Sequence, residues 1–299
     1  QGEAAVLAEL PGRTGILEGI AYRPRTGDLF FGDVHLRCIW RRDRDGRVTR
    51  FSAEDEGLFG VFGIAIDETR NTLWAATTAL PEMVGYDAEM KGEAALAEFN
   101  LTTSELRRIV PVPGDGRDHG LGDVLIAPDG TVYTTDSVSP IVWQLPPDSE
   151  ELVKLVDSPE FVSLQGLVLS GRTLVVADYA NGLFAINLAD RSFRAFKPPA
   201  NTTLLGLDGL VAVPDGIVGV QNGVTPQRVV RLALSPDLQT VTGVTVLASA
   251  LPDLGDLTLI TMMDGRPTFL GGAGWDAFEA AKGKPAAVHT VRVFQVNLP

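Results

Sequence analysis

Leu17-Glu18-Gly19-Ile20 is the first copy of a four-residue pattern that recurs five more times along the chain. The further copies are Val61-Phe62-Gly63-Ile64, Leu121-Gly122-Asp123-Val124, Leu164-Gln165-Gly166-Leu167, Leu207-Asp208-Gly209-Leu210 and Leu254-Gly255-Asp256-Leu257. The third positions fall at 19, 63, 123, 166, 209 and 256, so the steps between copies are 44, 60, 43, 43 and 47 residues. A period in the forties, made of strand-like segments, is typical of propeller blades. We therefore predict an all-β, six-bladed β-propeller.

Length and composition favour one large β domain over residues 1–299. Hydrophobic residues make up 45 % of the chain, and 32 Gly and 19 Pro supply frequent turns. All-β closed folds often reach this size as one unit. No apolar run approaches the roughly 20 residues needed to span a membrane. A formal charge of −13 argues against a nucleic-acid surface, which needs a basic face, and is compatible with a cation site and a monomer.

Each copy of the pattern begins a strand, and a turn and a second strand follow. Pro128-Asp129-Gly130 and Pro214-Asp215-Gly216 are two of these turns, in which proline presets φ and glycine accepts a positive φ. The last blade is one strand short at the C-terminal end. We expect Ala4 to Leu10 to supply its missing outer strand, because pairing the two chain ends closes the ring and removes a sheet edge.

Two blades carry extra sequence between their second and third strands. These insertions are Leu80 to Ala97 in blade two and Trp275 to Val288 in blade six. In an up-and-down blade this loop lies at the end where the first strand begins, so both should overhang the face that carries Glu18 and Asp208. They could be ordinary surface loops or lids over a site.

The second position of the pattern should recur around the central axis, and there the copies differ. Glu18 and Asp208 are acids, and two carboxylates that converge on a tunnel repel unless a cation or proton lies between them. Gln165 adds an amide oxygen, and Asp123 stands one residue further along its own copy. Oxygen ligands of this kind suit a divalent cation such as Ca²⁺, whereas zinc prefers His or Cys. The alternative is that the acids only satisfy exposed amides at the tunnel mouth.

At the level of whole-chain pattern, the sequence resembles the regucalcin/gluconolactonase group of six-bladed propellers, which includes luciferin-regenerating enzyme and is related to the paraoxonases. The best matches are residues 17–20 with Gly27 to Val34, the stretch Gly122 to Ser137, and residues 207–210. The resemblance implies a divalent cation, commonly Ca²⁺, held by Glu18 and Asp208. It also implies that Asp208 acts as base or nucleophile in lactone hydrolysis.

The chain departs from that group at three positions. Gln165 stands where the group usually has an Asn ligand, and Gly122-Asp123 replaces Asn-Asp at the start of blade three. Gly120 occupies the position of an Arg that helps to bind sugar lactones. The histidines of paraoxonases are not matched, because blade two presents Phe62. A metal site is therefore expected, but specificity for aldonolactones is not.

Other motifs are weak. The chain contains no Gly-x-Ser-x-Gly elbow, His-Glu-x-x-His motif or Walker loop. His119 directly precedes the pattern of blade three and could act at the tunnel mouth as a catalytic group, or could simply be a solvated loop residue.

Two functions remain open. The first is a metal-dependent hydrolase of a small lactone or ester, with Asp208 as the base and His119 as a second catalytic candidate. The second is a non-catalytic propeller that binds a small ligand or protein partner on its axial face. The expected partner is a small molecule, with neither nucleic acid nor membrane involved, and the sequence does not decide between a periplasmic or secreted and a cytoplasmic location.

Overall fold

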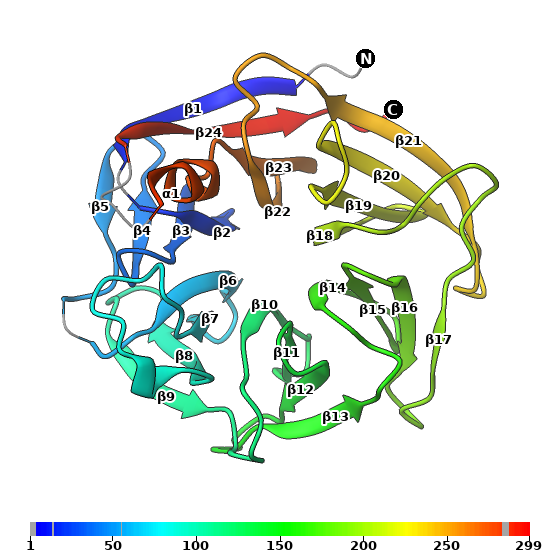
Figure 1. Ribbon diagram of the computed structural model, residues 1–299, viewed down its shortest axis with the longest axis horizontal. Helices are drawn as coiled ribbons and strands as arrows, with labels where there is room; N and C mark the ends of the chain where they lie inside the picture. Colours follow the sequence, from blue (N-terminus) through cyan, green and yellow to red (C-terminus); the bar gives the residue numbers. More distant parts are fainter. Residues whose placement is uncertain (1–3, 14, 55, 283–286) are drawn as a thin grey trace.

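The computed structural model describes residues 4–13, 15–54, 56–282 and 287–299. Its strands form six four-stranded antiparallel sheets arranged around one axis, which confirms the six-bladed β-propeller (Figure 1). Blades one to three contain β2 (Leu17–Arg23), β3 (Asp28–Asp33), β4 (Cys38–Arg42), β5 (Val48–Arg50); β6 (Gly60–Asp67), β7 (Thr72–Thr78), β8 (Ala94–Asn100), β9 (Leu106–Pro111); and β10 (Leu121–Ile126), β11 (Val132–Asp136), β12 (Ile141–Leu145), β13 (Val153–Asp157). Blades four to six contain β14 (Leu164–Ser170), β15 (Thr173–Asp178), β16 (Gly182–Asn187), β17 (Phe193–Ala195); β18 (Leu207–Val213), β19 (Gly216–Gln221), β20 (Arg228–Leu234), β21 (Val241–Ser249); and β22 (Leu257–Met263), β23 (Arg266–Gly271), β24 (His289–Val296), β1 (Ala4–Arg13).

Strands from the two ends of the chain close the ring. β1 pairs with β24 in antiparallel register, from Ala4 opposite Val296 to Arg13 opposite His289. The predicted closure is therefore confirmed, although the strand extends to Arg13 and not only to Leu10. Register shifts after Val6 and after Leu10 interrupt this outer strand. Such irregularities twist an edge and make further strand addition less favourable.

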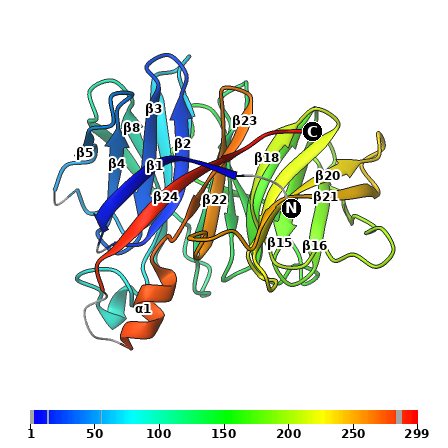
Figure 2. The same ribbon diagram turned by 90° about the horizontal axis from the view of Figure 1, so that it is seen from above.

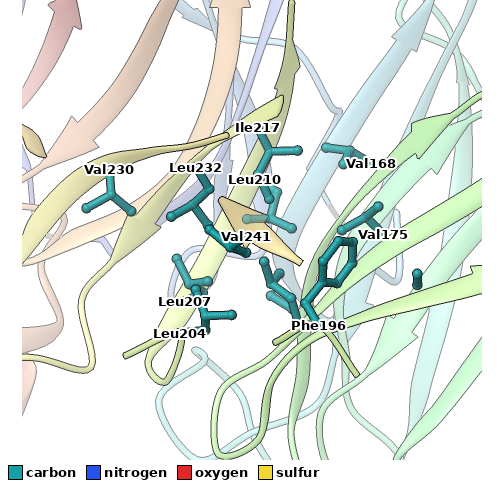
Figure 3. Close-up of a cluster of buried hydrophobic side chains, with 13 residues drawn as sticks. Val168, Val175, Phe196, Leu204, Leu207, Leu210, Ile217, Val230, Leu232 and Val241 are labelled. Carbon is teal, nitrogen blue, oxygen red and sulfur yellow. The ribbon is translucent and has the colours of Figure 1, made fainter. Parts of the chain in front are cut away.

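The core lies between neighbouring blades. Aliphatic and aromatic side chains on facing sheets interdigitate in clusters such as the one between blades four and five, shown in Figure 3. Val175 of β15 and Ile217 of β19 lie on the two sides of that interface and are almost completely buried. Because each sheet buries both faces, the axial ends of the strands are held rigidly, and side chains that begin the innermost strands occupy fixed positions.

Both insertions lie at the end of the molecule where the innermost strands begin, as predicted. The blade-six insertion forms the helix α1 (Trp275–Ala281), and the blade-two insertion contains a short 3-10 helix, Ala88–Met90 (Figure 2). The blade-two insertion is shorter than predicted, because β8 already begins at Ala94, so that residues 94–97 are strand. Residues 283–286 of the blade-six insertion lie outside the described residues. Within the described chain, no helix combines the length and the apolar character required to cross a membrane.

Candidate active site at the axis

A bulge at the start of each innermost strand presents the second residue of the pattern to the axis. In β2, Leu17 pairs with Asp33 but Ile20 pairs with Phe31, so one residue of the inner strand is left without a partner. The same shift occurs in the other five innermost strands. A bulge re-aims side chains and strengthens the local twist. The repeated pattern is therefore a repeated bulge.

In blade six this bulge corrects the sequence assignment. The register shift lies between Leu257 and Ile260, so the sixth copy is Leu257-Thr258-Leu259-Ile260 and not residues 254–257. Thr258 takes the second position, and its hydroxyl donates to the Leu17 carbonyl at 3.2 Å. Gly255 is off the axis; its φ of +60° explains why a glycine stands there. Asp256 also has a different role, because its Oδ2 accepts the backbone N–H groups of Gly274 and Trp275 at the start of α1.

The third positions form a tight ring in which each blade touches the next. A Cβ at Gly19 would collide with the Phe62 carbonyl, and one at Gly166 would collide with the Asp208 carbonyl. At Gly209 a Cβ would lie 2.9 Å from the Cα of Leu259. Glycine is thus needed where the neighbouring backbone passes closely, and this closeness brings the second-position side chains together at the tunnel mouth.

Glu18 and Asp208 are the two acids at this mouth, and both side chains are buried. Glu18 Oε2 accepts the Nε1–H of Trp275 at 2.5 Å. Burial raises the pKa of Glu18 well above its usual range, and the negative charge of Asp208 raises it further. Burial also raises the pKa of Asp208 to about 6, against a hydrogen bond from Asn222 that lowers it. Both acids therefore hold their negative charge less readily than acids in water.

Asn222 was not singled out from the sequence, yet it orders the Asp208 carboxylate. Its Nδ2 donates to Asp208 Oδ2 at 2.7 Å and to the Leu257 carbonyl at 2.9 Å. Both partners are acceptors, which fixes the orientation of the amide. Its Oδ1 is buried and has no hydrogen-bond donor among the described residues. A buried acceptor without a donor is costly unless water or a cation reaches it.

Gln165 also presents a free amide oxygen. Its Nε2 donates to the Ser163 hydroxyl at 3.0 Å, and none of the residues that the structure describes donates to its Oε1. That oxygen faces blade three, 3.4 Å from the position that a Cβ at Gly122 would occupy. Because residue 122 is glycine and has no side chain, it leaves room for the Gln165 amide, which is one methylene longer than that of Asn.

Asp123 lies deeper in the tunnel. It accepts the backbone N–H of Val124 at 2.8 Å and lines an apolar cavity of about 490 Å³ formed by the later residues of the six innermost strands. Burial raises the pKa of Asp123 to about 7, and the charge of Asp208 contributes to the shift. Asp123 thus affects the axial acids through its charge.

His119 is held in a separate network. Its Nδ1 lies 2.7 Å from Asp136 Oδ2, its Nε2 lies 3.1 Å from Asp115 Oδ1, and its ring packs edge-on against Trp143. The side chain is buried, and both ring nitrogens already face carboxylates. The structure therefore does not bring His119 into contact with Glu18 or Asp208. Its catalytic role stays a prediction.

The axial donor set has the chemistry of a hard-cation site, although it is sparse. Across residues 4–13, 15–54, 56–282 and 287–299, no three His, Cys, Asp or Glu side chains converge closely enough to hold a metal ion. Glu18 and Asp208 are the carboxylates at the tunnel mouth; Asn222 contacts Asp208, and Gln165 holds the second position of the pattern in blade four. Within the same residues, no Lys or Arg forms an ion pair with either acid. The unpartnered Asn222 Oδ1 fits a cation whose ligands are oxygens.

The whole chain is similar in fold to several solved structures. A gluconolactonase from Xanthomonas campestris superimposes with a TM-score of 0.66 over 98 % of this chain and 89 % of its own, at 16 % identity. Luciferin-regenerating enzyme gives 0.66 over 100 % and 96 %, at 14 % identity. The fold is that of the gluconolactonase group.

The same fold also supports other chemistry. Virginiamycin B lyase from Staphylococcus aureus superimposes with a TM-score of 0.64 over 99 % of this chain and 100 % of its own, at 11 % identity. At such identities a superposition establishes the fold alone. No protein-family model and no curated protein sequence matches the chain. The function must therefore be argued from the axial residues.

Proposed function

We propose that this propeller hydrolyses a small lactone or ester at Glu18 and Asp208. The observation that carries the proposal is a pair of buried carboxyl groups at one tunnel mouth, with pKa values raised by burial and with no basic partner among the residues that the structure describes. Buried acids with a structural role are normally paired with hydrogen-bond donors or with Arg or Lys. Catalytic sites, by contrast, often keep acids whose pKa values are shifted. The fold shared with a gluconolactonase supports the reaction class, because lactones are cyclic esters.

The proposed cofactor is a divalent cation, Ca²⁺, with Glu18, Asp208, Gln165 and Asn222 as its protein ligands. Asp123 contributes negative charge from deeper in the tunnel. When bound, such an ion polarises a substrate carbonyl and stabilises the charge that develops on its oxygen. It would also relieve the repulsion between the two carboxylates, which burial makes unfavourable.

Asp208 is placed to act as the base. Its Oδ2 is held by Asn222, so Oδ1 is the oxygen that is free to take a proton from an attacking water. With a pKa of about 6, this carboxylate is ionised at neutral pH and is a stronger base than an ordinary Asp. Water would attack the ester carbonyl carbon, the C–O bond to the leaving alcohol would break, and the proton held by Asp208 would pass to the alkoxide.

Aromatic side chains define the kind of substrate. Phe62 and Trp275 lie beside the acids with ring centroids 6.4 Å apart, and Trp275 holds Glu18 in place. Gly120 stands where sugar-lactone enzymes of the resembling group carry an Arg. We therefore propose a substrate that is more apolar than an aldonolactone, with few hydroxyl groups.

The test is a panel of apolar and polyhydroxylated lactones and small esters, assayed with Ca²⁺ present. We expect Asp208→Asn to lower kcat by about 10²- to 10⁴-fold. Asp190→Asn is the matched control, because it removes an exposed acid that lies in the β16–β17 turn. Equal rates for wild type, Asp208→Asn and buffer over the whole panel would reject hydrolysis and favour a propeller that only binds its ligand.

The metal is tested separately. Because a cation that binds only the native state stabilises it by about 2.7 kcal/mol at a hundredfold excess over its Kd, EDTA should lower the melting temperature and Ca²⁺ should restore it. Glu18→Gln/Asp208→Asn should show no response. If the melting temperature of wild type also does not respond to EDTA or Ca²⁺, and the protein purified without chelator contains no metal, then the cation site is rejected.

A further inference from the structure

A second cavity, separate from the tunnel, lies between the two insertions. It has a volume of about 460 Å³ and is lined by His35, Pro81, Glu82, Met83, Trp275, Phe278 and Glu279. Residues 81–83 belong to the blade-two insertion, residues 275–279 to α1, and His35 follows β3 of blade one. Figure 2 shows α1 and the blade-two insertion extending beyond the same end of the propeller.

His35 connects the two insertions into one structure. Its Nδ1 is hydrogen-bonded to the Glu82 carbonyl, its own carbonyl accepts the Val84 N–H at 2.9 Å, and its ring packs against Phe278 with centroids 4.5 Å apart. Asp256 fixes the other end of the arrangement by accepting the N–H of Trp275. The cavity walls are thus anchored to the propeller on both sides, which a ligand site requires.

The polar groups of this cavity are acceptors. A carbonyl can only accept, so His35 Nδ1 carries the hydrogen and Nε2 of the neutral ring is left with a lone pair. Glu82 and Glu279 add two carboxylates, and Met83 adds a thioether. Among the described lining residues there is no Lys or Arg. A ligand that satisfies this set must bring donors and positive charge.

The remaining walls are aromatic and apolar. Trp275 and Phe278 present rings that attract cations through their π-electrons, and a cation loses less by leaving water when such faces and carboxylates surround it. The formal charge of −13 raises the local concentration of cations around the whole molecule. Apolar walls with acceptor-only polar groups match an organic ammonium ion that carries an apolar body.

We propose that the cavity between the two insertions binds an organic amine in its ammonium form. The inference does not depend on hydrolysis at the axis. Trp275 is a wall of this cavity and also donates to Glu18, so an occupied cavity would lie directly beside the axial acids. A molecule that carries both an ammonium group and an ester could then reach both sites at once.

The test uses phenethylammonium as the probe, with binding followed by calorimetry and by tryptophan fluorescence. Phenethyl alcohol and phenylpropionate are the neutral and anionic probes of similar shape. We expect a Kd of about 1 mM or tighter for the ammonium probe and at least tenfold weaker binding of the other two. Binding of the alcohol as tightly as the ammonium, or no binding of the ammonium probe, would overturn the proposal.

Variants assign the binding to this cavity. Glu82→Gln/Glu279→Gln should weaken phenethylammonium binding about tenfold, and Phe278→Ala should weaken it by a similar factor through the lost ring. Glu89→Gln removes one carboxylate from an exposed position of the blade-two insertion and should have no effect. Glu18→Gln/Asp208→Asn should still bind phenethylammonium. If this variant loses binding while Glu82→Gln/Glu279→Gln keeps it, then the ammonium site is at the axis and the proposal is overturned. Melting curves of each variant verify that it is folded.

Discussion

Asp136 and Asp208 are both buried aspartates at the same end of the propeller, but their surroundings differ sharply. Asp208 accepts one hydrogen bond from a side chain, that of Asn222. Asp136 accepts hydrogen bonds from five groups: the backbone N–H groups of Gly120, Val138 and Ser139, and the rings of His119 and Trp143. Both carboxylates are buried, so Asp136 and Asp208 differ chiefly in the number of hydrogen-bond donors around each.

Position within the repeat explains the difference. Asp33, Asp136 and Asp178 all end the second strand of a blade and bind backbone N–H groups of the loops on either side. An aspartate at the same position therefore fastens these loops in blades one, three and four. Glu18 and Asp208 occupy the bulge position, where the six copies carry six different residues. A buried acid that is repeated and saturated with donors holds the fold, whereas a unique and undersaturated one is available for chemistry.

The largest effect that tests this comparison should come from Asp136→Asn. The amide replaces one acceptor oxygen by a donor that faces other donors, so we expect a loss of about 3 to 5 kcal/mol in unfolding free energy. The melting temperature should fall by roughly 10 °C, measured by circular dichroism. A fall of less than about 2 °C would mean that the donor count does not reflect a structural role.

Asp208→Asn should behave in the opposite way. Removing a charge that burial already disfavours should leave the unfolding free energy of the metal-free protein within about 1 kcal/mol of wild type, or raise it. The same variant is the one expected to lose turnover. Denaturant unfolding in EDTA measures the first quantity. A destabilisation as large as that of Asp136→Asn would remove the distinction between the two aspartates.

The pH dependence of stability gives a third test. Asp208 and Asp123 have pKa values raised to about 6 and about 7 in the folded protein, from a usual value of 3.8. Their folded state binds protons more tightly, so their stabilising contribution is complete below pH 3.8 and is lost as pH rises through 6 and 7. Without metal, the melting temperature should therefore rise as the pH is lowered from 8 to 5.

Variants and metal separate this contribution from that of other groups. Asp123→Asn/Asp208→Asn should flatten the slope between pH 5 and pH 8, while Asp190→Asn should leave it unchanged. Added Ca²⁺ should oppose the trend, because it binds the ionised carboxylates that dominate at high pH. If the double variant keeps the wild-type slope, then Asp123 and Asp208 are not the groups that titrate.

The smallest effect is expected for Trp275→Phe. The variant keeps a ring beside Phe62 but loses the hydrogen bond to Glu18, which is worth about 1 kcal/mol. Since that bond lowers the pKa of Glu18 against the effects of burial and Asp208, its removal should raise this pKa further. Carboxyl ¹³C NMR titration measures the change, and a pKa that does not rise would show that Trp275 does not tune the acid.

Sequence reasoning found the fold because the bulge demands a recognisable pattern. It failed in blade six, where Leu259 takes the third position and fills the space beside Gly209, so neither Gly nor Asp marks the true copy. Residues 254–257 resembled the pattern more closely, yet 254–256 precede β22, and Asp256 accepts backbone N–H groups at the start of α1. The period of the repeat could be predicted. The presence of Leu259 in place of a small residue at the third position of blade six, where it packs beside Gly209 of blade five, could not.

The axial acids could be predicted for the same reason, since position two of each copy must face the axis. Their partners could not. Trp275 lies 257 positions from Glu18 along the chain. It begins a helix whose first backbone N–H groups are held by Asp256. Asn222 directly follows β19, but nothing in the sequence shows that its amide turns toward Asp208. Its identity as a polar residue just after a second strand was the available signal.

The pairing of β1 with β24 also bears on how the protein is made. Ala4 and its partner Val296 are far apart in the chain, so ribosomes synthesise them about 15 to 60 s apart at 5 to 20 residues per second. Throughout that interval blade six cannot form, and the ring has a gap through which blades one and five expose apolar faces. Closure by the most distant contacts in the chain also favours slow folding. The nascent propeller is therefore most exposed to chaperones and proteases just before β24 emerges.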